Sequence, residues 1–535
     1  MNHPITEVSE KITCEPKDGM KVYILAFLGI LGIVVLAFGS SLSFQFLVRS
    51  DDQAYIYRNP FLQNLTFDNL RAIFSSIHFD SYLPMTLTSY SLDYTFWKSN
   101  PFGYHLTQIL LHACNSFLVF IILMRVNAGR LLAFSTALIY AVHPVHVESV
   151  VWVAERKNLL SGFFIFLSLY FYIRFTDGEK SGKGGLMVSW FLFVLALLSK
   201  SIAVMLPLVF VLYDLCIAKR GLRLLEKIPF FLGSIVCAWG TLFTQGSAGA
   251  IQEYAGGSFF TAMLFSMRVY LDYFVSLVAP VNLSPYYFYA RENLWDGLSI
   301  LSYLLVPAVI FYAVKNFRSR PYLAFAVGWF VLWLLPVSNL VPLATIRQDR
   351  YLYLPSLTVF LFGFLAIANT RWFRLDRKRS LVLAGLLIVS LTGATIKYSY
   401  TFASSRAFWL HVAEKYPEWS QAQFEAGYQC WITEDKACAV RHYRKALQAN
   451  PDNAFALNNY GAILIDEGNY AEAKTYIEKA RRADPGYASP YQNLAVIARK
   501  TGEDLDRVPE WKKKFDRIRS SARKKTYQLG EFKIR

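Results

Sequence analysis

The amino-acid sequence predicts an all-α protein with two parts, a polytopic helical membrane domain and a C-terminal α-solenoid. Two observations lead to this fold class. Long apolar blocks fill residues 1–397, and 54% of the whole chain is hydrophobic. A 34-residue repeat of prolines and small residues follows in the remainder. Apolar blocks of about 20 residues can cross a bilayer as helices, whereas regular helical repeats stack into solenoids.

The membrane domain is predicted to contain about eleven crossings. These apolar blocks are 22–45, 104–124, 130–147, 157–175, 185–198, 202–218, 228–246, 298–314, 321–341, 352–369 and 380–397. The first is too long for the apolar region of a signal peptide and has no small-residue cleavage site after it, so we expect a retained anchor. A further block, 259–280, contains Arg268 and Asp272, and these charges favour an interfacial position over a crossing.

The net charge of +17 records membrane topology rather than nucleic-acid binding, because much of it lies in short loops between apolar blocks. These basic loops are 125–130, 174–183, 219–227, 315–320 and 371–379. If all five face the cytoplasm, the first outer loop (46–103) and everything after residue 398 share the outer face. That loop is long and aromatic, and we expect it to form amphipathic helices on the membrane.

Many polar residues fall on the same predicted outer face. They are Asp51, Asp52, Asp80, Asp93, His143, His146, Glu148, Arg156, Lys157, Lys200, Arg268, Arg291, Arg347, Asp349 and Arg350. Some of them are expected to be ordinary loop residues. A transport path would place charges within the spans, which hold few. Carboxylates, histidines and guanidinium groups on one membrane face therefore indicate a binding or catalytic site.

The repeats after residue 398 match the tetratricopeptide pattern, in which two antiparallel helices pack closely over small residues. The repeating positions are Pro417, Pro451 and Pro485, and Gly427, Gly461 and Ala495. We assign 398–505 to these repeats and 506–535 to a basic C-terminal cap or tail. Such arrays bind extended peptides in a groove, or else act as scaffolds for oligomerisation. Cys430 and Cys438 fall on the two helices of one repeat, where they either form a disulfide or are two small core residues.

The segment "HPVHVE" contains a second cluster, His143, His146 and Glu148. In an extended or turning segment, residues 146 and 148 would point the same way because they are two apart. Three interpretations stay open for this cluster. It holds a zinc ion, although the spacing is not a known zinc motif on a helix; it contacts acceptor or sugar hydroxyls; or it ends a helix.

Five stretches carry a resemblance to a known family. They are "SDDQAYIYRNP", "HPVHVESVVWVAERKNLLSGFF", "LSKSIAVMLPLVFVLYDL", "RVYLDYFVSLVAPVNLSPYY" and "IRQDRYLYLPS". With the repeats after them, they make the chain resemble bacterial relatives of the transmembrane and tetratricopeptide-repeat O-mannosyltransferases, members of the GT-C glycosyltransferase superfamily. The resemblance covers most of the chain. It implies sugar transfer, usually with inversion, from a polyprenyl-phosphate carrier to a hydroxyl group of an exported protein.

The resemblance also implies roles for particular residues. GT-C enzymes carry their essential acid just after the first span, where Asp51 and Asp52 lie. We predict Asp51 as the base, with Asp52 assisting or coordinating a divalent metal. The leaving phosphate needs cations, for which Arg350, Arg347 and Lys200 are the candidates, with Arg268 if 259–280 is interfacial. His143, His146 and Glu148 are candidate substrate contacts, and His146 and Glu148 also candidate metal ligands.

The predicted partners are therefore membrane lipid, a polyprenyl-phosphate sugar and a protein acceptor bound by the repeats, with no nucleic acid. The expected location is the bacterial inner membrane, with the site and the repeats on the periplasmic face. Two alternatives stay open: a non-catalytic, membrane-anchored scaffold for an envelope complex, and a lipid-linked oligosaccharide ligase or flippase. A pure scaffold has no need of Asp51, Glu148 and Arg350 together.

Overall fold

A computed structural model describes residues 19–48, 50–57, 59–78, 81–178, 182–247, 253–342, 345–368 and 377–530. Asp80 and the side chain of Arg291, both noted above, lie outside the described part. The chain divides into two compact units, Met1–Ala403 and Ser404–Arg535. The division lies after Ala403 and not at residue 397, where the sequence predicted it. The reason is that the last apolar helix, α17 (Arg377–Ser399), continues through η13 (Tyr400–Phe402). The described residues form helices and no β-strand, apart from one isolated bridge between His78 and Ser81.

Among its described residues, the first unit contains eight helices that are long and apolar enough to cross a membrane. They are Gly19–Ser43 (α2, Gly19–Phe38, with η2), Pro101–Arg125 (α5), Val153–Thr176 (α8, Arg156–Thr176, with η5), Ser201–Ala218 (α10, Leu206–Tyr213, with η6 and η7), Leu224–Thr244 (α11, Ile228–Ser247, with η8), Phe259–Val278 (α12), Gly297–Lys315 (α13) and Val382–Phe402 (α17 with η13). The prediction of a multi-pass helical membrane protein is confirmed.

Four further apolar helices complete this unit. The helix α6 (Arg130–Val142) and the following segment Pro144–Val151 pass the same test together but are bent by 52°, which makes up to nine spans. Shorter apolar helices lie at Lys183–Leu197 (within α9, Gly182–Leu197), Pro321–Val337 (α14, Pro321–Leu334, with η11, Leu335–Val337) and Ser356–Ala366 (within α15, Ser356–Ala368). All eleven predicted blocks thus correspond to helices. The helix α12 also meets the criterion for a span, and its interfacial position stays a prediction.

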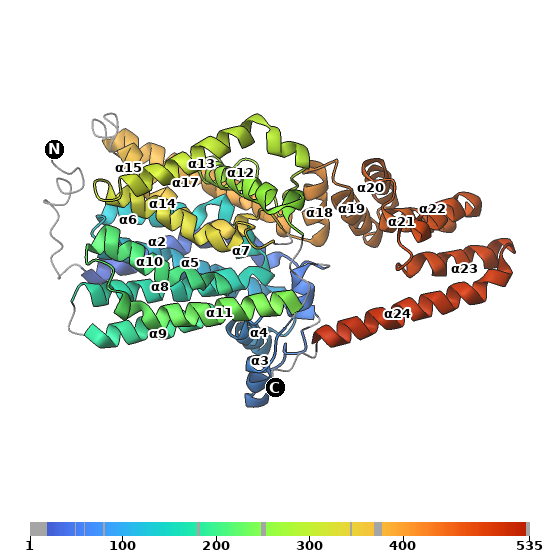
Figure 1. The fold of residues 1–535 in the computed structure, drawn as a ribbon, viewed down its shortest axis with the longest axis horizontal. Coiled ribbons are helices and arrows are strands. Elements are labelled where there is room, and N and C mark those ends of the chain that lie inside the picture. Colours follow the sequence, from blue (N-terminus) through green and yellow to red (C-terminus); the bar gives the residue numbers. More distant parts are fainter. Residues whose placement is uncertain are drawn as a thin grey trace. The chain divides into compact units, whose positions relative to one another are not determined.

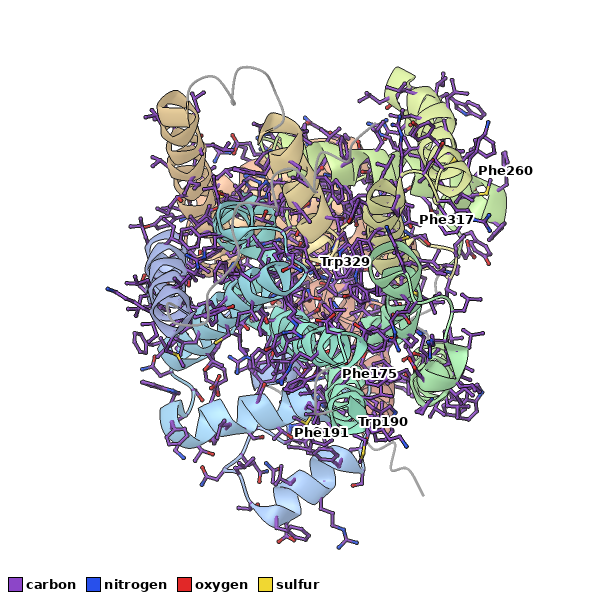
Figure 2. All side chains as sticks on the ribbon, turned by 90° about the vertical axis from the view of Figure 1, so that its left-hand side faces the viewer. Phe175, Trp190, Phe191, Phe260, Phe317 and Trp329 are labelled. Carbon is purple, nitrogen blue, oxygen red and sulfur yellow. A yellow bond between two sulfur atoms is a disulfide. The ribbon has the colours of Figure 1, made fainter. Side chains whose placement is uncertain are left out.

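The surface of the helix bundle is apolar, as hydrocarbon requires. In Figure 2, which looks along the bundle, Trp190 and Phe191 on α9 and Phe260 on α12 lie at the periphery, whereas Trp329 lies among the helices. Phe191 and Phe260 are 57% and 60% exposed, and Trp329 is 1% exposed. Large apolar side chains on the outside are costly in water but fit a lipid environment.

The α8–α9 connection and the helices α3 (Phe67–Phe74) and α4 (Pro84–Trp97) lie toward opposite ends of the bundle (Figure 1). Figure 1 shows α8 and α9 meeting at the left, where α15 also ends. The helices α3 and α4 lie toward the other end. Phe67 and Phe96 of these helices are 80% and 73% exposed. Such side chains fit the headgroup region of a membrane.

The second unit is a row of antiparallel helix pairs: α18 (Ser405–Lys415), α19 (Ser420–Ile432), α20 (Lys436–Ala449), α21 (Ala454–Asp466), α22 (Tyr470–Ala483), α23 (Ser489–Thr501) and α24 (Val508–Gly530). The small residues of this unit allow the close helix packing that the repeat pattern predicts. A Cβ atom on Gly427 would lie 2.8 Å from the Tyr443 ring, and one on Gly461 would lie 2.6 Å from the Ile477 side chain. Trp511 of α24 is buried in the shared core, so the basic segment begins as the helix that caps the solenoid.

The sequence left open whether Cys430 and Cys438 are bonded to each other. Cys430 and Cys438 form a disulfide between α19 and α20, with their Cα atoms 5.7 Å apart. The disulfide joins the two helices of one repeat, so it closes that hairpin covalently.

Candidate functional site

The candidate site is built on a break in the helices between α7 (Val147–Val151) and α8, at η5 (Val153–Glu155). The segment between α2 and α5, together with α5 itself, holds the backbone of this break. Ala154 N donates to Asp52 Oδ1 (2.8 Å), the Tyr90 hydroxyl donates to Val153 O (2.7 Å), and Gln108 Nε2 donates to Trp152 O (2.9 Å). These bonds fix the break against the loop that carries the paired aspartates.

Asp52 is the buried member of that pair. Its side chain accepts backbone N–H bonds on both oxygens, from Leu47 (2.8 Å) and from Ala154. Burial raises the pKa of Asp52 to about 7, against the two N–H donors, which lower it. Since both oxygens are occupied by the main chain, Asp52 positions the loop.

Asp51 is the accessible member. Its side chain is 34% exposed, and its Oδ2 lies 3.8 Å from Lys157 Nζ. The same ammonium group lies 4.9 Å from the centre of the Tyr55 ring. A carboxylate that faces outward beside a cation can still reach a substrate, which Asp52 cannot.

Glu155 is the centre of a cluster of cations. Its carboxylate lies 3.3 Å from Lys157 Nζ, 3.3 Å from Arg350 Nε and 3.7 Å from Lys200 Nζ. The Glu155 side chain is fully buried, and the three cations are 11–14% exposed. They come from three separate segments of the chain. The cluster therefore concentrates positive charge near Asp51, which lies 3.8 Å from Lys157 Nζ.

Arg350 is held by a second glutamate. Its Nη1 donates to Glu148 Oε1 (2.7 Å), and its backbone N–H donates to Glu148 Oε2 (2.9 Å). It lies on the short helix η12 (Asp349–Leu352). Just beyond that helix, the Tyr353 hydroxyl is 2.9 Å from both His112 Nδ1 and Asn115 Nδ2 of α5. These bonds anchor the segment that presents the guanidinium group.

Lys200 is the cation most easily neutralised. Its Nζ donates to Asn158 Oδ1 (2.6 Å). Burial lowers the pKa of Lys200 to about 7, although Glu155 opposes that shift. Its charge is therefore sensitive to pH in the neutral range, whereas a guanidinium group stays charged.

The histidine cluster does not form as the spacing suggested. His146 and Glu148 lie in consecutive helical turns, η4 (Pro144–His146) and α7, so residues two apart point to different sides. His146 bonds to Tyr140 O (2.9 Å) and to Ser356 Oγ (3.0 Å), whereas Glu148 bonds to Arg350. His143 accepts from Val145 N (3.3 Å) and caps η4. The expectation that residues 146 and 148 point the same way is wrong.

The possible metal ligands Asp52, His146 and Glu148 likewise have their polar atoms bonded to protein groups. Within the described ranges, no group of three His, Cys, Asp or Glu side chains is arranged to hold a metal ion. The three predicted ligands therefore do not fit a metal centre.

Arg347 and Arg268 belong to a different network. Arg347 donates to Ser276 Oγ (2.7 Å) and lies 3.5 Å from Asp272, and its guanidinium group is 3.8 Å from the centre of the Tyr287 ring. Arg268 pairs with the same Asp272 (3.0 Å) and with Asp296. This network joins α12 to the start of α13. Of the four predicted phosphate cations, the Glu155 cluster thus brings together Arg350 and Lys200.

An apolar cavity of about 550 Å³ lies among α6, α12, α13, α14, α15 and α17. Leu271 and Leu277 of α12, Phe330 of α14 and Gly363 of α15 line it. His143, at the end of α6, also faces this cavity. Since Glu148 follows five residues later, one broken helix connects the cavity with the cation cluster.

Known proteins match this architecture. The tetratricopeptide repeat family matches residues 437–497. The human protein O-mannosyl-transferases TMTC1 and TMTC4 are 24% and 25% identical over 456 and 463 residues, each match covering 74% of the chain. The Caenorhabditis elegans protein O-mannosyl-transferase F38B6.6 is 24% identical over 505 residues, or 89% of the chain. The sequence of the chain is thus similar to those of protein O-mannosyl-transferases over most of its length.

The chain spans only part of these O-mannosyl-transferases: 50% of TMTC1, 57% of TMTC4 and 66% of F38B6.6. Among solved structures, ArnT from Cupriavidus metallidurans, bound to undecaprenyl phosphate, matches 91% of this chain and 81% of its own, with 16% identity and a TM-score of 0.39.

Sequence reasoning missed Glu155 and Asn158, although both lie in "VAERKN" within a stretch that carries the O-mannosyltransferase resemblance. The signal was available, since charged residues opening an apolar block are costly unless they are paired. Arg156, in the same segment, contributes to the packing of the helices. It pairs with Asp93, donates to Tyr104 O (2.8 Å) and lies over the Tyr90 ring, so it fastens α4 to α8.

Proposed function

We propose that this protein is a membrane glycosyltransferase that moves a sugar from a polyprenyl-phosphate donor to a hydroxyl group of an exported protein. The observation that carries the proposal is the accessible Asp51 beside the three cations around Glu155. The relationship to protein O-mannosyl-transferases supports the same reaction class. The repeats would recruit the acceptor, and the reaction would take place on the outer face of the membrane.

In this mechanism Asp51 accepts the proton of the acceptor hydroxyl while that oxygen attacks the anomeric carbon. The bond between the anomeric carbon and the phosphate oxygen breaks, and the phosphate leaves with the electron pair. Attack from the side opposite the phosphate inverts the anomeric configuration. Asp52 keeps Asp51 in place through its bonds to Leu47 and Ala154.

The leaving phosphate would lie against Lys157, Lys200 and Arg350. These side chains are held by Glu155 and Glu148 before substrate arrives, so little reorganisation is needed when negative charge develops. Arg350 offers the planar guanidinium donors that suit phosphate oxygens. His143, His146, Arg268 and Arg347 contribute to helix packing and to the neighbouring network.

Lys200 gives the reaction a testable pH dependence. Because the pKa of Lys200 is about 7, the ammonium form is lost as the pH rises through that value, and kcat/KM is expected to fall. In Lys200→Arg the charge persists to a pH above about 12, so the fall should vanish or move to much higher pH. A pH profile of kcat/KM, which reports groups of the free enzyme, makes the measurement. Identical profiles for both proteins would contradict this role.

The apolar cavity would hold the prenyl chain. Gly363 lines it, and a Cβ atom there meets nothing within 4 Å, so the large side chain of Gly363→Trp should occupy part of the cavity. Displacing even two buried CH₂ groups costs about 1.6 kcal/mol, or about tenfold in affinity. Binding of a fluorescent polyprenyl phosphate is the measurement. Gly240→Trp on α11, also free of close neighbours, is the matched control, and equal binding by both variants would argue against the cavity.

The activity itself is tested by supplying purified protein with radiolabelled polyprenyl-phosphate mannose, chosen for the sugar in the relatives' names, and an unfolded acceptor protein rich in serine and threonine. Radioactivity in the protein fraction is the expected result. Binding of the lipid without transfer of any monosaccharide would instead favour the ligase or flippase alternative.

A further inference from the structure

The positive charge of the second unit is concentrated in its last helix. Residues 404–507 contain 13 Lys/Arg and 14 Asp/Glu, so the repeats are close to neutral. The helix α24 contains 8 Lys/Arg and 2 Asp/Glu within 23 residues. Positive residues in the short loops between apolar blocks follow membrane topology, but α24 is not such a loop. Its charge therefore points to a partner of its own.

In the repeats, exposed cations are neutralised by neighbouring acids. Lys436 Nζ lies 2.9 Å from Glu467 Oε1, and Arg481 Nη2 lies 2.7 Å from Glu478 Oε2. The three lysines at 512–514 of α24 are exposed and form no ion pair with any side chain that the structure describes. The charge of these lysines is therefore not compensated within the described part of the unit.

Packing in the unit fixes one side of α24. Trp511 is buried in the hydrophobic core of the repeats, and Phe515 and Ile518 pack against that core. Their spacing of i, i+4 and i+7 places the three residues on one side of the helix. The guanidinium group of Arg519 lies 5.8 Å from the centre of the Phe515 ring, beside this contact. The core contact thus determines which side of α24 faces away from the repeats.

Charged side chains cover the remaining surface of α24. At about 100° per residue, Lys513 and Arg517 lie on the side away from Trp511. The exposed charged residues of 511–520 are Lys512, Lys513, Lys514, Asp516, Arg517 and Arg519. The helix α24 has 23 residues against 13 in α23, and Figure 1 shows it extending past α23. The unit therefore presents a long basic surface along its last helix.

The chain itself keeps a membrane close to the second unit. The last apolar helix of the first unit ends with η13 at Phe402, and α18 of the second unit begins at Ser405. Because only Ala403 and Ser404 connect them, the repeats cannot diffuse away from the bilayer that holds the first unit. Such a tether raises the effective concentration of the membrane around the repeats. Anionic lipid headgroups attract Lys and Arg side chains that lie near the membrane surface.

We propose that α24 binds the headgroups of anionic lipids through its basic surface, while Trp511, Phe515 and Ile518 keep the helix attached to the repeats. The helix then anchors the repeats to the membrane by charge, in addition to the apolar spans of the first unit. This inference does not rest on the proposed sugar transfer, because neither Asp51 nor the Glu155 cluster belongs to α24.

The test uses the full-length protein in lipid nanodiscs, made either of phosphatidylcholine alone or of equal parts of phosphatidylcholine and phosphatidylglycerol. Hydrogen exchange of the α24 backbone amides, followed by mass spectrometry, is the measurement. Bound headgroups hinder local opening of the helix, so exchange should be about tenfold slower in the anionic nanodiscs. Salt at about 1 M shortens the Debye length to about 3 Å and should abolish this difference.

A triple variant tests whether the lysines of α24 carry the effect. Lys512→Gln, Lys513→Gln and Lys514→Gln together remove three exposed charges and leave the core contact of α24 intact. Exchange of α24 in the anionic nanodiscs should then approach its rate in the neutral nanodiscs. The matched control removes three exposed charges from α20 and α22 and should keep the slow exchange of α24. This control combines Arg441→Gln, Lys445→Gln and Lys479→Gln.

Equal exchange of α24 in the two nanodiscs would overturn the proposal, as would slow exchange that persists at high salt or in the triple variant. Polyglutamate, added to the protein in neutral nanodiscs, tests a different class of partner. Slowing of α24 exchange by polyglutamate but not by phosphatidylglycerol would refute the lipid as partner and indicate an acidic protein. The lipid and salt comparisons use the unaltered chain, so they decide the question even where a variant folds poorly.

Discussion

Asp51→Asn is expected to reduce sugar transfer by about 10²–10⁴-fold, the usual contribution of a general base, while the protein folds normally. The amide cannot accept the proton of the acceptor hydroxyl. Because Asp51 is 34% exposed and lies 3.8 Å from the Lys157 ammonium group, its replacement should cost about 1 kcal/mol of stability or less. Initial rates of transfer and thermal unfolding, measured on the same preparation, make the comparison.

Two other variants isolate this effect. Asp52→Asn leaves one of two buried backbone N–H groups facing an amide N–H, and should therefore destabilise by about 1–3 kcal/mol. Asp68→Asn changes an exposed acid of α3 in the same loop and should leave transfer unchanged. Full activity in Asp51→Asn would refute the assignment of the base.

Glu155→Gln is expected to lower the free energy of unfolding by about 3–5 kcal/mol, the cost of removing one partner from a buried charge cluster. Three cations would then lose their shared carboxylate. Repulsion among Lys157, Lys200 and Arg350 should also open the cluster, so transfer should fall together with stability. Denaturation in detergent micelles measures the first effect.

The matched control for this variant is Glu226→Gln. Glu226 is 22% exposed and pairs with Arg220 outside the cluster, so its replacement should cost less than about 1 kcal/mol. Equal destabilisation by both substitutions would show that Glu155 has no special place in the protein.

Much of the fold follows from patterns that depend on local sequence. Apolar blocks must be helical in a bilayer because no water satisfies their backbone, and the 34-residue step of Gly427 and Gly461 reflects the contact each makes with the partner helix. The place of Asp51 directly after the first span can be read from the sequence, and its role as the base stays a prediction. In these cases one short segment contains the whole signal.

The rest of the site depends on contacts between distant segments. Glu155 gathers cations from positions 157, 200 and 350, and nothing near Glu155 specifies the latter two. His146 looked like a ligand because its neighbours include His143 and Glu148, but the helical turn directs it to Ser356, 210 residues away. The cavity is likewise a space between six helices, which no single helix encodes.

The anchoring of Asp52 affects how sequence change would spread around the site. Its two partners are peptide N–H groups of Leu47 and Ala154, which every residue except proline supplies. Positions 47 and 154 can therefore exchange one side chain of suitable size for another without loosening the loop, while the acid itself cannot change. Variation at positions 47 and 154 need not be matched by variation at Asp52. Comparison of related sequences should therefore show little covariation between Asp52 and these two positions. A proline at either position should be absent from active relatives.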